Sequence, residues 1–228
     1  MSARLRKFLY ENGLTLVFLL LFALALVGQA IAGYHEFNSL QVQHSSSTIS
    51  FGRYVTSSDF GASVMENWQS EYLQFTLFIL LTVFLLQRGS PESKELGKGG
   101  VESDQAQRIG GHASPRSPRW ARHGDVRTRL YSNSLVIVMT AIWVGSWFAQ
   151  SITGWSEFNA DRFGHEQDAL SYGSYLGSAH FWQTTLQNWQ SEFLAVASMA
   201  ILAVYLRQRG SPESKPVGAP HDATGVEG

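Results

Sequence analysis

Residues 14–32 read LTLVFLLLFALALVGQAIA, nineteen consecutive residues without a charged side chain. As an α-helix with a rise of about 1.5 Å per residue, this run is roughly 28 Å long, about the thickness of the hydrocarbon core of a bilayer. A helix that is apolar on every side needs lipid or a large protein core around it. The run therefore predicts a membrane-spanning helix.

A cleaved signal peptide is the alternative interpretation of this run. Arg4, Arg6 and Lys7 precede it, and it ends in the small-residue stretch 30–32, as signal peptides do before their cleavage site. The run is long for a signal peptide, however, and a matching segment recurs in mid-chain, where no signal peptide acts. We therefore expect a retained span.

Three further apolar blocks lie at 75–86, 135–152 and 193–206. The block 135–152 is long enough to span by itself. The other two reach spanning length only when the Asn-Trp-Gln-Ser-Glu segments 67–71 and 188–192 extend them. Four spans of this kind predict an all-α integral membrane fold.

The basic residues predict the orientation of the four spans. Three of them precede the first span, nine lie between the second and third spans, and three lie at the end of the fourth span or beyond it. Only Arg53 and Arg162 fall in the two remaining loops. Because basic loops stay in the cytoplasm, the N- and C-termini are both expected there.

An internal duplication gives the expected architecture. A shift of 121 residues brings 10–94 onto 131–215 without a gap, and 33 of the 85 positions are identical. Each half runs helix, outer loop, helix, so both halves enter the membrane in the same direction. We expect a four-helix bundle made of two tandem parallel two-helix repeats. The predicted domains are a first repeat at 1–94, a disordered basic cytoplasmic linker at 95–125, a second repeat at 126–215 and a disordered tail at 216–228.

The identical Asn-Trp-Gln-Ser-Glu segments predict a polar site within the membrane. Their glutamates would lie roughly 7 Å below the outer boundary of the bilayer core, where a carboxyl group is costly unless it is paired, protonated or hydrated. One interpretation is a proton, ion or solute path. The other is a structural hydrogen bond from Gln29 to Glu71 and from Gln150 to Glu192. The candidate polar network comprises Gln29, Asn67, Glu71, Gln150, Asn188 and Glu192.

The sequence Gln-Arg-Gly-Ser-Pro-Glu-Ser-Lys occurs twice, at 87–94 and at 208–215, each time where a helix leaves the membrane. Glycine followed by proline is typical of a helix C-terminus, and arginine suits the helix dipole and lipid phosphates. Capping does not explain why all eight residues are identical, so a docking motif for a cytoplasmic partner is the alternative. Its candidate residues are Gln87, Arg88, Gly89, Gln208, Arg209 and Gly210.

Several functions are disfavoured by composition and motif content. The chain has no cysteine, which excludes disulfides, thiolate metal sites and cysteine nucleophiles. The loop histidines match no metal signature, and none lies in an apolar block, as a haem-binding bundle would need. A net charge of -1 gives no reason to expect a nucleic-acid partner. We find no nucleophile with a base at the same depth, and so expect no enzyme, no cofactor and no metal.

The sequence resembles a family of short bacterial membrane proteins described only as a domain of unknown function. The resemblance rests on residues 11–14 at the start of the first span, Gly28-Gln29 near its end, 67–71 and 87–90. It covers the two repeats and leaves out the linker and the tail. It implies a location in the bacterial cytoplasmic (inner) membrane, and it brings no activity or site residue.

Taken together, these features favour a non-enzymatic structural or partner-binding membrane protein. Its expected partners are the lipid bilayer and either a second copy of the chain or another membrane protein. The alternative function is a small ion, proton or solute permease or channel that uses Glu71 and Glu192.

Overall fold

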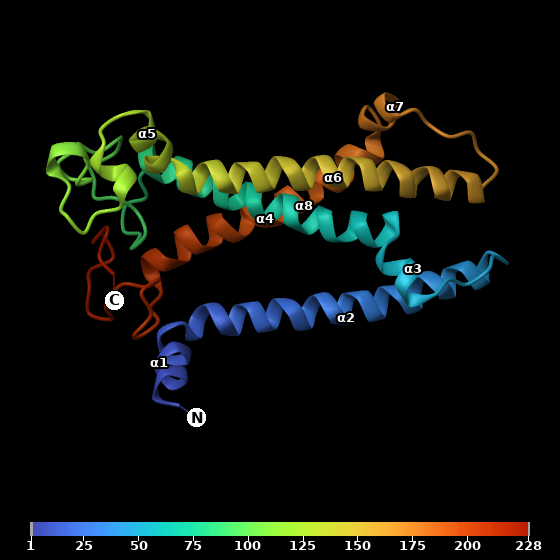
Figure 1. Cartoon of the computed structure of the whole chain (residues 1–228), viewed down its shortest axis with the longest axis horizontal. Coiled ribbons are helices and arrows are strands. Elements are labelled where there is room, and N and C mark those ends of the chain that lie inside the picture. The colour runs from blue at the N-terminus through green and yellow to red at the C-terminus, as the bar shows by residue number, and fades with distance from the viewer. Residues whose placement is uncertain (1, 228) are drawn as a thin grey trace. The chain divides into compact units, whose positions relative to one another are not determined.

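The chain is built of helices and connecting loops, which confirms the predicted all-α class (Figure 1). This computed structural model describes residues 2–227, a range that holds eight α-helices, two short 3-10 helices and no strand. The α-helices are α1 (Ala3–Glu11), α2 (Gly13–Gln43), α3 (Phe51–Val55), α4 (Ser58–Phe84), α5 (Val126–Ser132), α6 (Ser134–Gly164), α7 (Tyr172–Leu176) and α8 (Ala179–Tyr205). The 3-10 helices are η1 (Gly110–His112) and η2 (Arg119–Arg122). Helices α6, α7 and α8 begin and end 121 residues after α2, α3 and α4.

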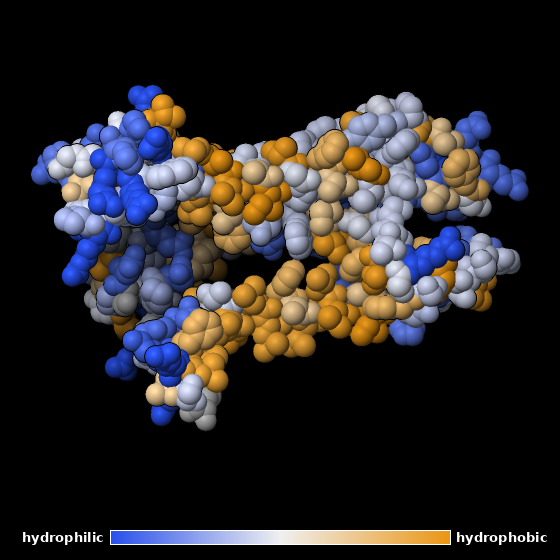
Figure 2. All heavy atoms as spheres, viewed as in Figure 1, coloured by the Kyte–Doolittle hydropathy of each residue, from blue (hydrophilic) through white to orange (hydrophobic). Residues whose placement is uncertain are grey.

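Two helices, α2 and α6, are long and apolar enough to cross a membrane, and each has 31 residues. They contain the predicted spans 14–32 and 135–152. Leu14, Phe18 and Leu24 are each more than half exposed on α2, and Figure 2 shows the apolar surface of this helix. A helix with apolar residues on its whole surface is typical of a lipid environment. The other two predicted spans, 75–86 and 193–206, fall in α4 and α8, which end at Phe84 and Tyr205, two residues and one residue before the predicted ends.

A short helix precedes each of these two candidate spans, and an asparagine separates it from the span. The backbone N–H and the side-chain Nδ2 of Asn12 both donate to the Phe8 carbonyl, at 3.0 and 2.9 Å. Asn133 Nδ2 donates to the Arg129 carbonyl at 2.8 Å at the end of α5. Each side chain satisfies a carbonyl of the last helical turn, so the short helix ends there and the chain changes direction.

The chain forms two compact units. The first unit comprises Met1–Val64 and Ile152–Ser171, and the second unit comprises Met65–Ser151 and Tyr172–Gly228. Helices α4 and α6 contribute residues to both, so the units are divided differently from the predicted repeats, linker and tail. That predicted division and the assembly of the helices into one four-helix bundle stay predictions.

In the first unit, an asparagine closes each of the loops that follow α2 and α6. The Asn38 side chain accepts the N–H of Ile49 at 2.8 Å and donates to its carbonyl at 3.1 Å. Asn159 makes the same two bonds with Leu170, at 2.8 and 3.0 Å. One amide thus satisfies both backbone groups of a loop residue, which explains why both halves have asparagine here.

In the second unit, Trp147 of α6 is at the centre of an aromatic cluster. The rings of Phe181, Trp182 and Trp189 of α8 lie 6.3, 6.2 and 5.6 Å from its ring, centroid to centroid. The Trp147 indole N–H also donates to the Thr185 hydroxyl at 3.5 Å. Contacts between aromatic rings at these distances are favourable, and they pack α6 against α8.

Candidate functional site

The Asn-Trp-Gln-Ser-Glu segments of α4 and α8 meet in the second unit. Trp189 Nε1 donates a hydrogen bond to Gln69 Oε1 at 2.6 Å. The Glu192 carboxylate lies beside the Ser70 hydroxyl and close enough to Glu71 for the two carboxylates to interact electrostatically. We call these five residues the polar contact. Gln69 and Ser70 are 0% and 2% exposed, so the centre of the polar contact is buried.

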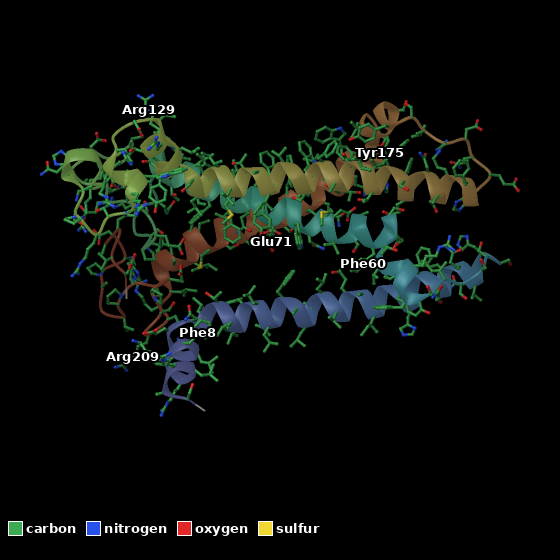
Figure 3. All side chains as sticks on the ribbon, viewed as in Figure 1. Phe8, Phe60, Glu71, Arg129, Tyr175 and Arg209 are labelled. Atoms are coloured by element: carbon green, nitrogen blue, oxygen red, sulfur yellow. The ribbon has the colours of Figure 1, made fainter. Side chains whose placement is uncertain are left out.

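The polar contact includes both of the predicted membrane glutamates. Figure 3 marks Glu71 on α4, where the side chain is exposed, whereas Glu192 is half-buried. Gln29, the predicted hydrogen-bond partner of Glu71, donates to the Ser63 hydroxyl at 2.8 Å within the first unit. The two glutamates therefore have each other as neighbours, one from each Asn-Trp-Gln-Ser-Glu segment.

Of the remaining predicted network residues, Asn67 and Asn188 belong to the same two segments, and Gln150 belongs to α6. Asn188 Nδ2 donates to the carbonyl of Thr184 in its own helix at 2.9 Å. The carbonyl of Asn67, an exposed residue, accepts the Ser70 hydroxyl at 3.0 Å. Gln150 is 1% exposed within α6. These bonds within the helices orient the side chains of Asn188 and Ser70.

Sequence reasoning missed Gln69, Ser70 and Trp189 as members of this site. Taken alone, a tryptophan at position 189 is typical of an interfacial anchor, and the sequence pattern indicates no role for Gln69. The available signal was the identity of the whole five-residue segment in both halves. A glutamate two positions after a glutamine lies on a different side of a helix, so a segment kept in full serves more than one helix face.

The second unit buries further polar side chains near its centre, including Thr76 and Thr185, which are 3% and 0% exposed. Within residues 2–227, Gln69 Nε2 and the Thr76 hydroxyl have no hydrogen-bond partner. Buried polar groups in proteins nearly always form hydrogen bonds. Each of these two groups can therefore bind a small polar molecule such as water.

The two Gln-Arg-Gly-Ser-Pro-Glu-Ser-Lys segments fold in the same way. We call Gln87–Lys94 the first helix-end loop and Gln208–Lys215 the second helix-end loop. In each, the hydroxyl of the second serine accepts the glutamine N–H at 2.9 Å and donates to the lysine carbonyl. Gly89 and Gly210 have φ of 84° and 81°, a left-handed conformation that favours glycine. The loop structure therefore accounts for the glycine and the second serine of the motif.

The lysine of each helix-end loop binds carbonyl groups of the chain that follows. Lys94 Nζ donates to the Gly100 carbonyl at 2.9 Å, and Lys215 Nζ donates to that of His221 at 2.8 Å. Lys215 also donates to Pro220 and Ala223 and is 1% exposed. Burial lowers the pKa of the Lys215 ammonium, the nearby Arg207 lowers it further, and Asp222 partly offsets this.

A pair of carboxyl groups joins the two helix-end loops. Glu92 of the first loop is hydrogen-bonded to Glu213 of the second. Burial raises the pKa of Glu92 to about 7, and the hydrogen bond and the charge of Glu213 act in the same direction. Two carboxyl groups can form a hydrogen bond with each other only while one of them holds a proton.

The two loops differ in how much of the predicted docking motif is accessible. The tail covers the first loop, because Gly89 N–H donates to Thr224 Oγ1 at 2.8 Å and Arg88 pairs with Asp222 at 3.7 Å. Gly89 is buried, whereas Gln87 and Arg88 remain exposed. In the second loop, all three candidate residues are exposed, and Figure 3 marks Arg209 there. They are Gln208, Arg209 and Gly210.

The recurring histidines of the outer loops lie together in the first unit. The rings of His44 and His165 are 6.0 Å apart, centroid to centroid, at an interplanar angle of 80°. His165 Nδ1 is 2.9 Å from the Asp161 carbonyl. Over residues 2–227, no three His, Cys, Asp or Glu side chains are grouped so that they could hold a metal ion.

Comparison with known proteins places the chain in a family. No curated protein and no solved structure matches it. One family model matches residues 5–226, which include the linker and most of the tail that the sequence resemblance had left out. The chain therefore belongs to the family described as "Domain of unknown function (DUF6766)".

Proposed function

We propose that the chain is a multi-pass protein of the bacterial cytoplasmic (inner) membrane, with α2, α4, α6 and α8 as its four spans. α2 and α6 have the length and apolarity of a span. α4 and α8 have 27 residues each, more than the roughly 20 needed to cross a bilayer core. Fifteen of the 17 basic residues fall on the side of the termini, which supports cytoplasmic N- and C-termini.

In this proposal the spans form a four-helix bundle of two tandem parallel repeats. The constant displacement of 121 residues between corresponding helices supports this. The paired chemistry supports it too, because Asn38 and Asn159 close their loops alike and the two helix-end loops have the same hydrogen bonds. Two spans per repeat bring both repeats into the membrane in the same direction, related by an axis along the membrane normal.

The proposed role is structural and non-enzymatic. The observation that carries it is the polar contact, in which Trp189 of α8 donates a hydrogen bond to the buried Gln69 of α4. Hydrogen bonds of this kind hold helices together in lipid. At the cytoplasmic face, the exposed second helix-end loop offers a surface to a partner, either a second copy or another membrane protein.

The test of the structural role is a double-mutant cycle between Trp189→Phe and Gln69→Leu. Each single variant should lower the free energy of unfolding by roughly 1 kcal/mol, and the double variant by less than the sum. Trp182→Phe, at the partly exposed tryptophan in the same aromatic cluster, is the matched control. Strictly additive losses would contradict the structural role of the Trp189–Gln69 bond.

A permease or channel is the second candidate, and two observations favour it. The carboxylates of Glu71 and Glu192 are neighbours, and Gln69 Nε2 and the Thr76 hydroxyl lie buried without a partner in the described part of the chain. An ion or proton path needs charge and polar groups of this kind at membrane depth. The test is ion or proton flux in liposomes. If the parent protein shows flux, and Glu71→Gln and Glu192→Gln lose it with unchanged thermal stability, the channel is the correct function and the structural proposal is wrong. The structural proposal predicts no flux in the parent protein.

A further inference from the structure

α1 is an amphipathic helix with an exposed apolar face. At about 100° per residue, Leu5, Phe8 and Leu9 lie on one side of the helix. They are 46%, 52% and 42% exposed, and none of the nine residues of α1 is buried. An apolar helix face without protein cover needs another apolar environment.

Basic side chains flank this face. Arg4 and Arg6 lie at its two edges, and Lys7 lies on the opposite side, where it forms an exposed ion pair with Glu11 at 3.7 Å. Arginines at the edges of an apolar face can place their aliphatic stems against acyl chains and their guanidinium groups among phosphates. The charge pattern fits an anionic lipid surface.

The direction of α1 fits the same surface. Figure 1 shows α1 turned crosswise to α2, and the turn occurs at Asn12, where the two helices are separated. A helix crosswise to a membrane span lies in the plane of the bilayer at the end of that span. With α2 as the first span, α1 is therefore at the level of the cytoplasmic headgroups.

Helix α5, which precedes α6 as α1 precedes α2, differs from α1 because it packs against protein. Thr128 of α5 is buried, and its hydroxyl donates to the Trp120 carbonyl at 2.6 Å and accepts the Gly124 N–H at 2.8 Å. α5 therefore packs against the protein segment that contains η2. In the structure of residues 2–227, by contrast, none of the α1 side chains is buried, so its apolar face is available to lipid.

We propose that α1 is a membrane-surface anchor that lies in the cytoplasmic leaflet and binds anionic phospholipid headgroups through Arg4 and Arg6. This inference rests on the proposed membrane topology. An interfacial helix of this type binds through buried apolar area together with attraction to anionic lipid. It fixes the rotation of α2 about its own axis, because α1 must stay in the plane of the leaflet.

The experiment uses the full chain, which has no native cysteine. Single cysteines at Leu9, Lys7 and Leu20 carry an environment-sensitive fluorophore, and the protein is reconstituted in phosphatidylcholine vesicles with or without phosphatidylglycerol. In vesicles that contain phosphatidylglycerol, a quencher attached to a lipid should quench the fluorescence of the Leu9 label about twofold more strongly than that of the Lys7 label. Equal quenching at Leu9 and Lys7 would overturn the inference. Aqueous quenching of the Leu20 label in α2 would instead contradict the proposed topology, so the two failures are distinguishable.

Charge variants separate anionic lipid binding from apolar burial alone. Arg4→Gln with Arg6→Gln should remove the effect of phosphatidylglycerol on the Leu9 label, because the attraction to anionic headgroups is lost. Arg116→Gln with Arg119→Gln removes the same number of charges from the linker and should leave the effect intact. An unchanged effect in the α1 variant, or an equal loss in the linker variant, would show that α1 does not bind the anionic lipid.

Discussion

Position 33 of α2 has room only for glycine, because the Tyr54 hydroxyl occupies the place where a Cβ atom would lie. Tyr54 is 3% exposed and packs between the rings of Phe37 and Phe60, at 5.6 and 5.5 Å. Gly33, which aligns with Gly154 in the second half of the chain, thus lets a buried tyrosine approach the backbone of α2. This contact fixes the small helix α3 against α2.

Gly33→Ala should therefore destabilise the protein by about 1–3 kcal/mol, the usual cost of overpacking. Thermal unfolding in detergent measures the loss. Gly28→Ala in the same helix is the matched control, because nothing lies within 4 Å of its added Cβ. Tyr54→Phe removes the colliding hydroxyl, so adding Gly33→Ala to that variant should cost much less. A loss in Gly28→Ala as large as that in Gly33→Ala would contradict this account.

Lys215 is the other residue whose role follows from its surroundings. Its ammonium group binds three carbonyls of the tail, so Lys215→Met should leave all three without their donor. We expect a loss of about 1–3 kcal/mol and faster proteolysis of residues 216–227. Lys98→Met is the control, because Lys98 is exposed and pairs only locally with Glu95. Equal proteolysis of the parent and Lys215→Met proteins would show that the tail is not held by this lysine.

At the scale of elements, the contact between the two helix-end loops should depend on pH. The pKa of Glu92 is raised from 4.5 to about 7 in the folded protein, so the folded state holds its proton more tightly than the unfolded state. The stabilisation is fully present below about pH 4.5, and it falls as pH rises and is lost above about pH 7. The loops should therefore separate more easily at the higher pH.

Thermal unfolding across this pH range tests the contact. Glu92→Gln should flatten the pH dependence, because an amide donates to Glu213 at every pH. Glu95→Gln, at an exposed carboxylate that pairs with Lys98, should keep the dependence of the parent. A parent-like pH profile in Glu92→Gln would mean that another group is responsible.

The elements also illustrate what the sequence could predict. The apolar runs predicted α2 and α6 because a helix in lipid is apolar on all sides, which composition alone reveals. The contact between α4 and α8 was not predicted, because Gln69 and Trp189 are 120 residues apart and periodicity within a helix does not identify its neighbour. The tail contacts were missed for a related reason. Lys215 and its carbonyl partners lie in a polar, glycine- and proline-rich stretch that resembles a disordered segment by composition.

For the molecule as a whole, the proposal is a membrane protein with four spans and paired polar segments in its outer half. Trp189 and Gln69 join the second helices of the two proposed repeats, and Glu92 and Glu213 join the loops at the C-terminal ends of the same helices. The first contact lies near the middle of α4 and α8, and the second lies beyond their C-terminal ends. Within the second unit, these contacts support the proposed pairing of α4 with α8.

The most direct test of the four-span topology is cysteine labelling in intact cells, which is unambiguous because the chain has no native cysteine. Ser46, Ser103 and Asp168 are all exposed, so accessibility at each depends on the side of the membrane and not on burial in the protein. A membrane-impermeant thiol reagent should label Ser46→Cys and Asp168→Cys, and it should label Ser103→Cys only after the cells are opened. Labelling of Ser103→Cys in intact cells, or protection of the other two, would contradict the four-span protein with cytoplasmic termini.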